Sequence, residues 1–171
     1  MLPVRYRPAE RVQTFAQAAE GQREEVQVHT EDYASVLFDM DGGAMGSLML
    51  SQVSAGRKNR PWIQVDGSDG AMAWDHDRPE ELWIGRRGRP NELVPRDPNL
   101  FAPGVGRFSD LPAGHAEGWA DALRNLMAEI YDFVRAGKNP VREAPTFPTF
   151  YDGLVENRLV DAILESHRRS A

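Results

Sequence analysis

The stretch from Ala34 to Val53, broken only by Asp41-Gly42-Gly43, constrains the fold more than any other part of this chain. Before the break, every second residue is apolar: Ala34, Val36, Phe38 and Met40. A period of two is that of a β-strand, and an Asp-Gly-Gly turn supplies the positive backbone dihedrals of a tight connection. The pattern therefore predicts an antiparallel hairpin.

Neither face of this predicted hairpin is plainly polar. Its second strand alternates Leu48 and Leu50 with Met45 and Met49, so small or apolar side chains occur on both sides. A sheet of this kind needs cover on both faces. We expect helices on one face and a second subunit on the other, which makes the chain a homo-oligomer through its sheet.

Further strands and two helices follow along the chain. The strands are expected at 61–65, 71–74, 81–84 and, more briefly, 92–94, and the rest of 86–114 is rich in Pro and Gly and predicts a long loop. Apolar residues at steps of three and four predict helices over 117–136 and 149–166. Strands first and helices last predict an α+β fold, a mostly antiparallel open sheet with helices packed on one face, without a Rossmann domain.

Composition bounds the domain organisation and the class of protein. Residues 1–25 are rich in Pro, Arg, Glu and Gln and predict an N-terminal arm or loop, while 26–171 predict a single domain with a substantial core. The net charge of −6 disfavours nucleic-acid binding, and no apolar run is long enough to span a membrane. The absence of cysteine and of a signal-peptide pattern fits the cytoplasm.

Motifs for cofactor, metal or nucleophilic chemistry are weak. The nearest match to a dinucleotide-binding loop, Gly104-Val-Gly106-Arg-Phe-Ser109, ends in serine and has no strand ahead of it, so we expect this chain to bind no cofactor. The Gly-x-Ser-x-Gly pattern that positions the nucleophile of serine hydrolases does not occur, so the sequence does not support serine catalysis. The triplet Asp75-His76-Asp77 indicates an exposed turn rather than a metal site. No catalytic or metal-binding residue is predicted.

Five residues are candidates for contact with a substrate. His115 precedes the first helix, where imidazole can reach a ligand hydroxyl, or can instead fix the loop through a backbone hydrogen bond. Arg57, Lys58 and Asn59 can hydrogen-bond sugar hydroxyls or form a solvated turn. Trp74 can stack on a pyranose or pack in the core.

Several short blocks in a fixed order resemble one protein family. They are Glu31-Asp32-Tyr33-Ala34, Ser54-Ala-Gly-Arg57-Lys58-Asn59, Asp66-Gly-Ser-Asp-Gly70-Ala-Met-Ala-Trp74, Leu111-Pro-Ala-Gly-His115-Ala-Glu-Gly-Trp119 and Phe150-Tyr-Asp152-Gly153. Together they resemble the C-terminal half of the glucose-fructose oxidoreductase, inositol dehydrogenase and MocA (Gfo/Idh/MocA) family, a fold similar to the C-terminal part of glyceraldehyde-3-phosphate dehydrogenase.

The resemblance implies a function and a missing part. Family members are dehydrogenases that exchange hydride between NAD or NADP and sugars, inositols or other polyols, and their C-terminal domain binds substrate and joins subunits. The cofactor and the acid-base residues belong to an N-terminal Rossmann domain, for which this sequence offers no counterpart. The resemblance therefore implies a truncated chain that is inactive alone; the alternative is a standalone, non-catalytic binding or dimerisation scaffold module.

Overall fold

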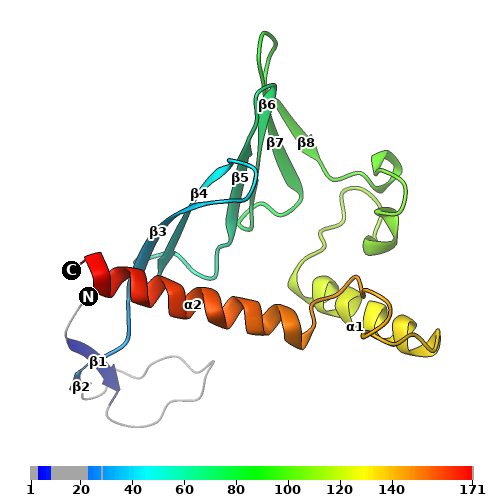
Figure 1. The fold of residues 1–171 in the computed structure, drawn as a ribbon. Coiled ribbons are helices and arrows are strands. Elements are labelled where there is room, and N and C mark those ends of the chain that lie inside the picture. Colours follow the sequence, from blue (N-terminus) through cyan, green and yellow to red (C-terminus); the bar gives the residue numbers. More distant parts are fainter. Residues whose placement is uncertain (1–3, 9–22, 28, 171) are drawn as a thin grey trace. The chain divides into compact units, whose positions relative to one another are not determined.

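The computed structural model describes residues 4–8, 23–27 and 29–170. The chain divides into two compact units, Met1–Arg57 and Lys58–Ala171. In the described residues every sheet is antiparallel, and the strands precede both long helices along the chain (Figure 1). This confirms the predicted α+β class.

The first unit begins with two short strands. Strand β1 (Val4–Pro8) pairs antiparallel with β2 (Arg23–Gln27). The arm predicted over residues 1–25 thus carries paired strand structure near both of its ends. The stretch 9–22, which makes up most of that arm, lies outside the described residues.

The predicted hairpin is present in the first unit. Strands β3 (Tyr33–Asp39) and β4 (Met45–Ser51) pair along their whole lengths. Gly42 and Gly43 both have positive φ, +94° and +88°, and the Gly43 amide donates to the Met40 carbonyl at 3.0 Å. These backbone angles explain why the turn needs two glycines.

The two faces of the β3–β4 hairpin differ in exposure. One face carries Leu37, Met45 and Met49, which are 80%, 82% and 69% exposed. On the other face the ring of Phe38 lies over its cross-strand partner Gly46, so that a Cβ there would be 2.2 Å from the ring. Among the described residues, the first of these faces is a largely exposed surface with three apolar side chains.

The second unit contains a four-stranded antiparallel sheet. Its strands lie in the order of the sequence: β5 (Trp62–Asp66), β6 (Gly70–Asp75), β7 (Glu81–Arg86) and β8 (Glu92–Pro95). All four match the strands predicted from alternation. Between them the chain approaches itself closely, since a Cβ at Gly70 would lie 2.5 Å from the Gly85 carbonyl oxygen.

Two α-helices complete the second unit. Helix α1 (Trp119–Arg135) begins after Gly118 and ends before Gly137, whose φ of +66° reverses the chain. Helix α2 (Phe150–Ser170) follows Thr149 and extends four residues beyond the predicted end. The long loop before α1 holds two single turns of 3₁₀ helix, η1 (Pro98–Leu100) and η2 (Gly106–Phe108).

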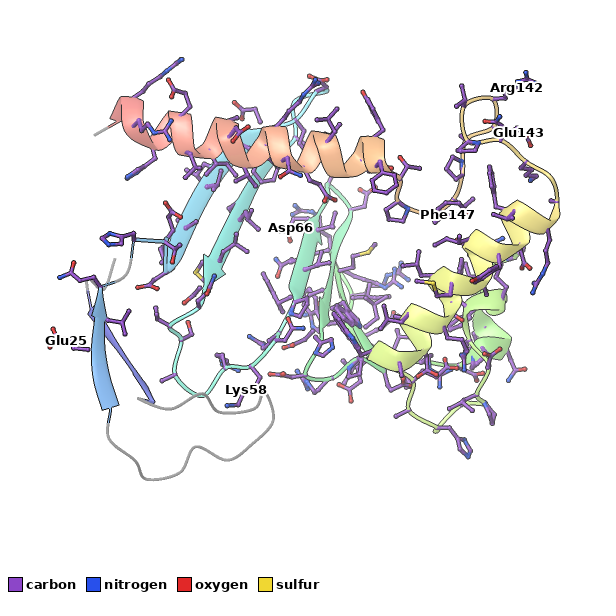
Figure 2. The ribbon with its side chains drawn as sticks, turned by 90° about the horizontal axis from the view of Figure 1, so that it is seen from below. Glu25, Lys58, Asp66, Arg142, Glu143 and Phe147 are labelled. Carbon is purple, nitrogen blue, oxygen red and sulfur yellow. The ribbon has the colours of Figure 1, made fainter. Side chains whose placement is uncertain are left out.

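An aromatic contact joins α1 to the segment that precedes α2. The Phe147 ring packs edge-to-face on Phe133, with centroids 5.4 Å apart, and Figure 2 shows Phe147 close to the start of α2. The predicted hydrophobic core, however, is not seen: no hydrophobic side chain of the described residues is fully buried, and Trp119 is exposed. The apolar stripes of these strands and helices are therefore at least partly exposed in the described residues.

None of the helices in the described ranges combines the length and the apolar character needed to cross a bilayer.

Candidate functional site

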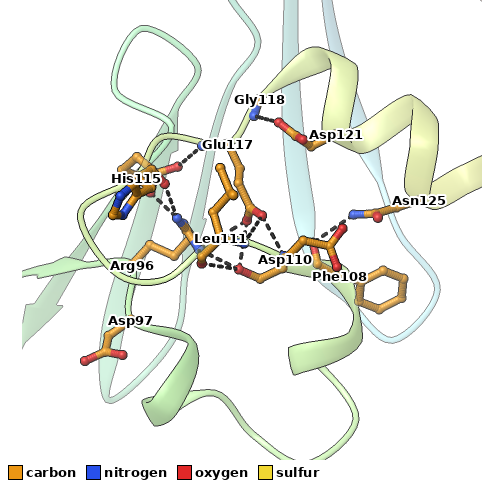
Figure 3. A network of polar contacts seen from close by, with 12 residues as sticks. Arg96, Asp97, Phe108, Asp110, Leu111, His115, Glu117, Gly118, Asp121 and Asn125 are labelled. Atoms are coloured by element: carbon orange, nitrogen blue, oxygen red, sulfur yellow. Dashed lines mark hydrogen bonds and ion pairs between the residues drawn. The ribbon is translucent and has the colours of Figure 1, made fainter.

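Arg96, just beyond β8, ties the loop before α1 to the four-stranded sheet. Its side chain is 13% exposed and forms ion pairs with Glu80 at 2.5 Å and with Glu117 at 3.1 Å. Glu80 immediately precedes β7, whereas Glu117 immediately precedes the cap of α1. A single guanidinium thus links the sheet to the start of the helix (Figure 3).

The same guanidinium also holds the loop itself. It donates to the Ser109 hydroxyl at 2.5 Å, to the Leu111 carbonyl at 3.1 Å and to the His115 carbonyl. The planar fork of arginine can serve several acceptors at once, and a buried charge is stable only when it is paired in this way. We call Arg96, Glu80, Glu117 and Ser109 the Arg96 cluster.

Glu117 is the acidic centre of the cluster. One carboxylate oxygen accepts from the Asp110 and Leu111 amides at 2.7 and 2.9 Å, and the other accepts from the Ser109 hydroxyl at 2.8 Å. Burial raises the pKa of Glu117, but these hydrogen bonds and the charge of Arg96 together outweigh it, so that the pKa lies below its usual value. The carboxylate is therefore charged at neutral pH.

His115 lies at the tip of the loop that the Arg96 cluster fixes. Its amide donates to the Pro112 carbonyl at 3.2 Å, and its carbonyl accepts from Arg96. The side chain is exposed, and within the described part of the chain no hydrogen bond to the imidazole is found. The backbone of His115 is thus anchored, while the ring is available to a ligand.

Arg57, Lys58 and Asn59 form an exposed turn, in which the Arg57 amide donates to the Ser54 carbonyl at 3.1 Å. The boundary between the two units falls between Arg57 and Lys58. Among the described residues of the second unit, no hydrogen bond or ion pair connects Lys58 or Asn59 to His115. A role for these three residues in binding sugar hydroxyls remains a prediction.

Trp74 lies on β6, in the sheet rather than in the His115 loop. Its indole N–H donates to the Pro79 carbonyl at 3.0 Å, and its ring meets that of His76 edge-to-face, with centroids 6.0 Å apart. Both contacts hold the ring in place. Stacking of Trp74 on a pyranose remains a prediction.

The segment Gly104–Ser109 does not fit a dinucleotide. A pyrophosphate site needs a strand that leads through glycines into an α-helix, whose free amides meet the phosphates. Here Gly104 lies within a turn, and residues 106–108 form one turn of 3₁₀ helix. The Ser109 hydroxyl is already engaged by Arg96 and Glu117.

In the triplet Asp75-His76-Asp77, both aspartates pair with Arg60. Asp75 accepts from two guanidinium nitrogens of Arg60, and Asp77 lies 3.0 Å from the same group. The Arg60 side chain lowers the pKa of Asp75, with a smaller contribution from the Asp77 amide. In the part of the chain that the structure describes, no three residues gather with the side chains that bind metals.

Sequence reasoning singled out His115 but missed what holds it. Arg96, Glu80 and Glu117 were not among the candidate residues predicted from the sequence. The ion pairs connect residues that are 16 and 21 positions apart. No local spacing could indicate them, because they depend on how the loop returns to the sheet.

Comparison with known proteins gives a consistent result. Residues 6–73 match the GFO/IDH/MocA C-terminal domain. An oxidoreductase structure from Sinorhizobium meliloti is 31% identical, with a TM-score of 0.73 over 83% of this chain and 41% of that one. An inositol dehydrogenase homolog from Azotobacter vinelandii, solved with NADH and myo-inositol, is 29% identical, with a TM-score of 0.73 over 81% of this chain and 38% of that one.

A curated relative, the uncharacterized oxidoreductase YfiI of Bacillus subtilis, is 29% identical over 96 residues, which make up 56% of this chain and 24% of that protein. The chain therefore spans about a quarter of this relative and about two fifths of the two solved structures.

Proposed function

We propose that this chain, whose residues 6–73 match the GFO/IDH/MocA C-terminal domain, forms the substrate-binding half of an NAD(P)-dependent dehydrogenase of sugars or polyols. The inositol dehydrogenase homolog, solved with NADH and myo-inositol, supports this substrate class. In this proposal, the 171 residues act together with a dinucleotide-binding domain.

The observation that carries the proposal is the anchored backbone and exposed ring of His115. A ligand-binding side chain must be held in place by groups other than the ligand, because binding otherwise costs the entropy of ordering the loop. The Arg96 cluster provides that support through bonds to both ends of the loop. The free imidazole can then donate to or accept from a substrate hydroxyl.

The antiparallel sheets support the proposal that substrate and cofactor bind to different domains. Dinucleotides bind at the carboxyl ends of parallel strands, at a helix N-terminus. In the described residues each strand pairing is antiparallel, and Gly104–Ser109 lacks the required geometry. The nicotinamide, which accepts or donates the hydride, is thus assigned to the partner domain, and we propose that the chain alone has no dehydrogenase activity.

We also propose that the exposed hairpin face of Leu37, Met45 and Met49 joins two copies of the chain. These residues would be costly to leave in water, since burial of apolar area is worth roughly 25 cal/mol per Å². A two-fold axis would place each of them against the same surface of the second copy.

The direct test is calorimetric titration of the chain with myo-inositol and with monosaccharides, before and after His115→Ala. We expect weak saturable binding that His115→Ala reduces by about tenfold, the loss of one or two hydrogen bonds. His167→Gln, which changes an exposed histidine on α2, is the matched control. Binding that is equally strong in His115→Ala would contradict the assignment of this residue.

A parallel titration with NAD(H) and NADP(H) tests the division between domains. We expect no heat of binding and no turnover of any polyol by the chain alone. Saturable binding of either nucleotide would place a cofactor site within these 171 residues and refute this part of the proposal.

A further inference from the structure

We propose that the face of the β5–β8 sheet that carries Trp62 and Trp83 binds an uncharged saccharide ring, at a site separate from the His115 loop. This inference goes beyond the proposed dehydrogenase function. It depends on the second unit alone, and it stands on the arrangement of two tryptophans, one alanine and several polar side chains across the strands.

The strand register brings these residues to one face. Gln64, Ala73, Trp83 and Leu93 lie opposite one another in a single row across all four strands. Trp62 and Asp75 form the start of the neighbouring row on the same face. The two tryptophans thus stand diagonally across β6.

Ala73 leaves a hollow between them. Because its side chain is a single methyl group, the space above β6 is not filled. An open pocket of about 470 Å³ is lined here by Trp62, Ala73 and Trp83, together with Trp74, Leu93 and polar neighbours. This volume falls within the range of small-molecule sites in proteins. It can hold one sugar ring and part of a second.

Trp83 is oriented by the glycine two residues further along its strand. A Cβ at Gly85 would lie 2.5 Å from Cη2 of the Trp83 ring and 3.0 Å from Cζ3. The indole therefore lies flat over the bare backbone of Gly85 and remains 37% exposed. Trp62 is 53% exposed. Flat, exposed indole surfaces are suited to stack on the C–H face of a pyranose.

Polar groups border the same hollow. One carboxylate oxygen of Glu81 forms an ion pair with the Arg78 guanidinium at 3.5 Å, and no hydrogen bond to this oxygen from a described residue is found. The oxygen can therefore accept a hydrogen bond from a further donor. A sugar hydroxyl is such a donor.

The charges around the hollow favour an uncharged ligand. Asp75, which is paired with Arg60, and Glu81 contribute carboxylates, Arg78 a guanidinium, and Gln64 an amide, so the lining bears both signs. An anion would meet the two carboxylates and a cation would meet the arginine. Several hydroxyls on a carbon ring match this mixture of acceptors and donors, as well as the tryptophan surfaces.

The experiment uses the whole 171-residue chain with methyl glucopyranosides, maltose and cellobiose as probes. Nitrogen-15 NMR resolves the indole N–H of each of the four tryptophans. We expect saturable shifts for Trp62 and Trp83 and much smaller ones for Trp119. His115→Ala should leave these shifts unchanged, so that this site and the proposed substrate site can fail independently.

Two variants sharpen the test. Trp83→Leu removes one stacking surface, and Gly85→Ala keeps the indole but displaces it from the backbone. We expect each to weaken binding by about tenfold. Val65→Thr, on the opposite face of β5, is the matched control and should bind as the unaltered chain does.

Three results would overturn the proposal. The first is the absence of saturable shifts with any probe at millimolar concentration. The second is binding that Trp83→Leu and Gly85→Ala both leave unchanged in folded protein. The third is evidence from concentration-dependent spectra that a second copy of the chain covers Trp62 and Trp83.

Discussion

Arg96 and Glu117 meet at 3.1 Å in a part of the protein where their side chains are only 13% and 10% exposed. One residue follows the last strand of the sheet and the other precedes the first helix. The pair connects two kinds of secondary structure that otherwise have few contacts with each other. Its removal should therefore affect both the stability of the second unit and the position of His115.

Arg96→Met should destabilise the chain by roughly 3 kcal/mol, because it leaves buried carboxylates without their counter-charge. Urea denaturation followed by circular dichroism measures this change. Arg135→Met is the control: its partner Asp132 is on the surface, and the loss should be below about 0.5 kcal/mol. Equal losses in the two variants would show that the Arg96 cluster has no special role.

Glu117→Gln should alter how stability depends on pH. In the folded chain the pKa of Glu117 lies below its ordinary value of 4.5, so its stabilising effect is present above that value and is lost as pH falls through the folded pKa. The variant should show a smaller loss of stability upon acidification. Urea midpoints between about pH 3 and pH 7 test this, with the exposed Glu156→Gln as control. Parallel curves for wild type and Glu117→Gln would refute it.

Thr149→Ala should shorten or destabilise α2. The Thr149 amide and hydroxyl donate to Asp152 at 2.6 and 2.7 Å, and the Tyr151 amide donates to the Thr149 hydroxyl at 3.2 Å. Loss of such a cap costs about 1 kcal/mol. The helical signal in circular dichroism should melt earlier than in Asp161→Asn, which changes an exposed carboxylate on the same helix.

Leu37→Lys combined with Met49→Lys should give a monomer if the proposed hairpin face joins two copies. Both side chains are highly exposed in the isolated chain, so the substitutions should leave the fold intact. Sedimentation velocity at micromolar concentration measures the outcome, and Val141→Lys, at an exposed site in the second unit, is the control. A monomeric unaltered chain would contradict the proposed assembly at once.

The elements that could be predicted are those with a local signature. Alternation around Asp41-Gly42-Gly43 predicted the hairpin, and in the structure the register of its strands places both glycines in the turn. The predicted helix start at 149 coincides with a local cap, in which Thr149 and Asp152, three residues apart, are hydrogen-bonded. In each case, the residues that determine the structural element are neighbours in the sequence.

The site could be predicted only in part for the opposite reason. His115 could be identified from its loop, but its anchors Arg96 and Glu80 lie far away along the chain. The missing core was also unexpected, because the apolar periodicity of a helix or strand shows that a face will be covered without showing by what. The sequence indicates which surfaces are apolar, and the structure shows that these remain uncovered here.

The flat placement of Trp83 over Gly85 couples the two positions in evolution. Any side chain at 85 would displace the indole from its place, so we expect this glycine to change in natural variants mainly where the residue at 83 has become smaller. Phe38 and Gly46 impose the same order of events in the hairpin. Variation among descendants of this sequence should therefore occur in pairs at these sites, with each aromatic ring and its glycine kept or lost together.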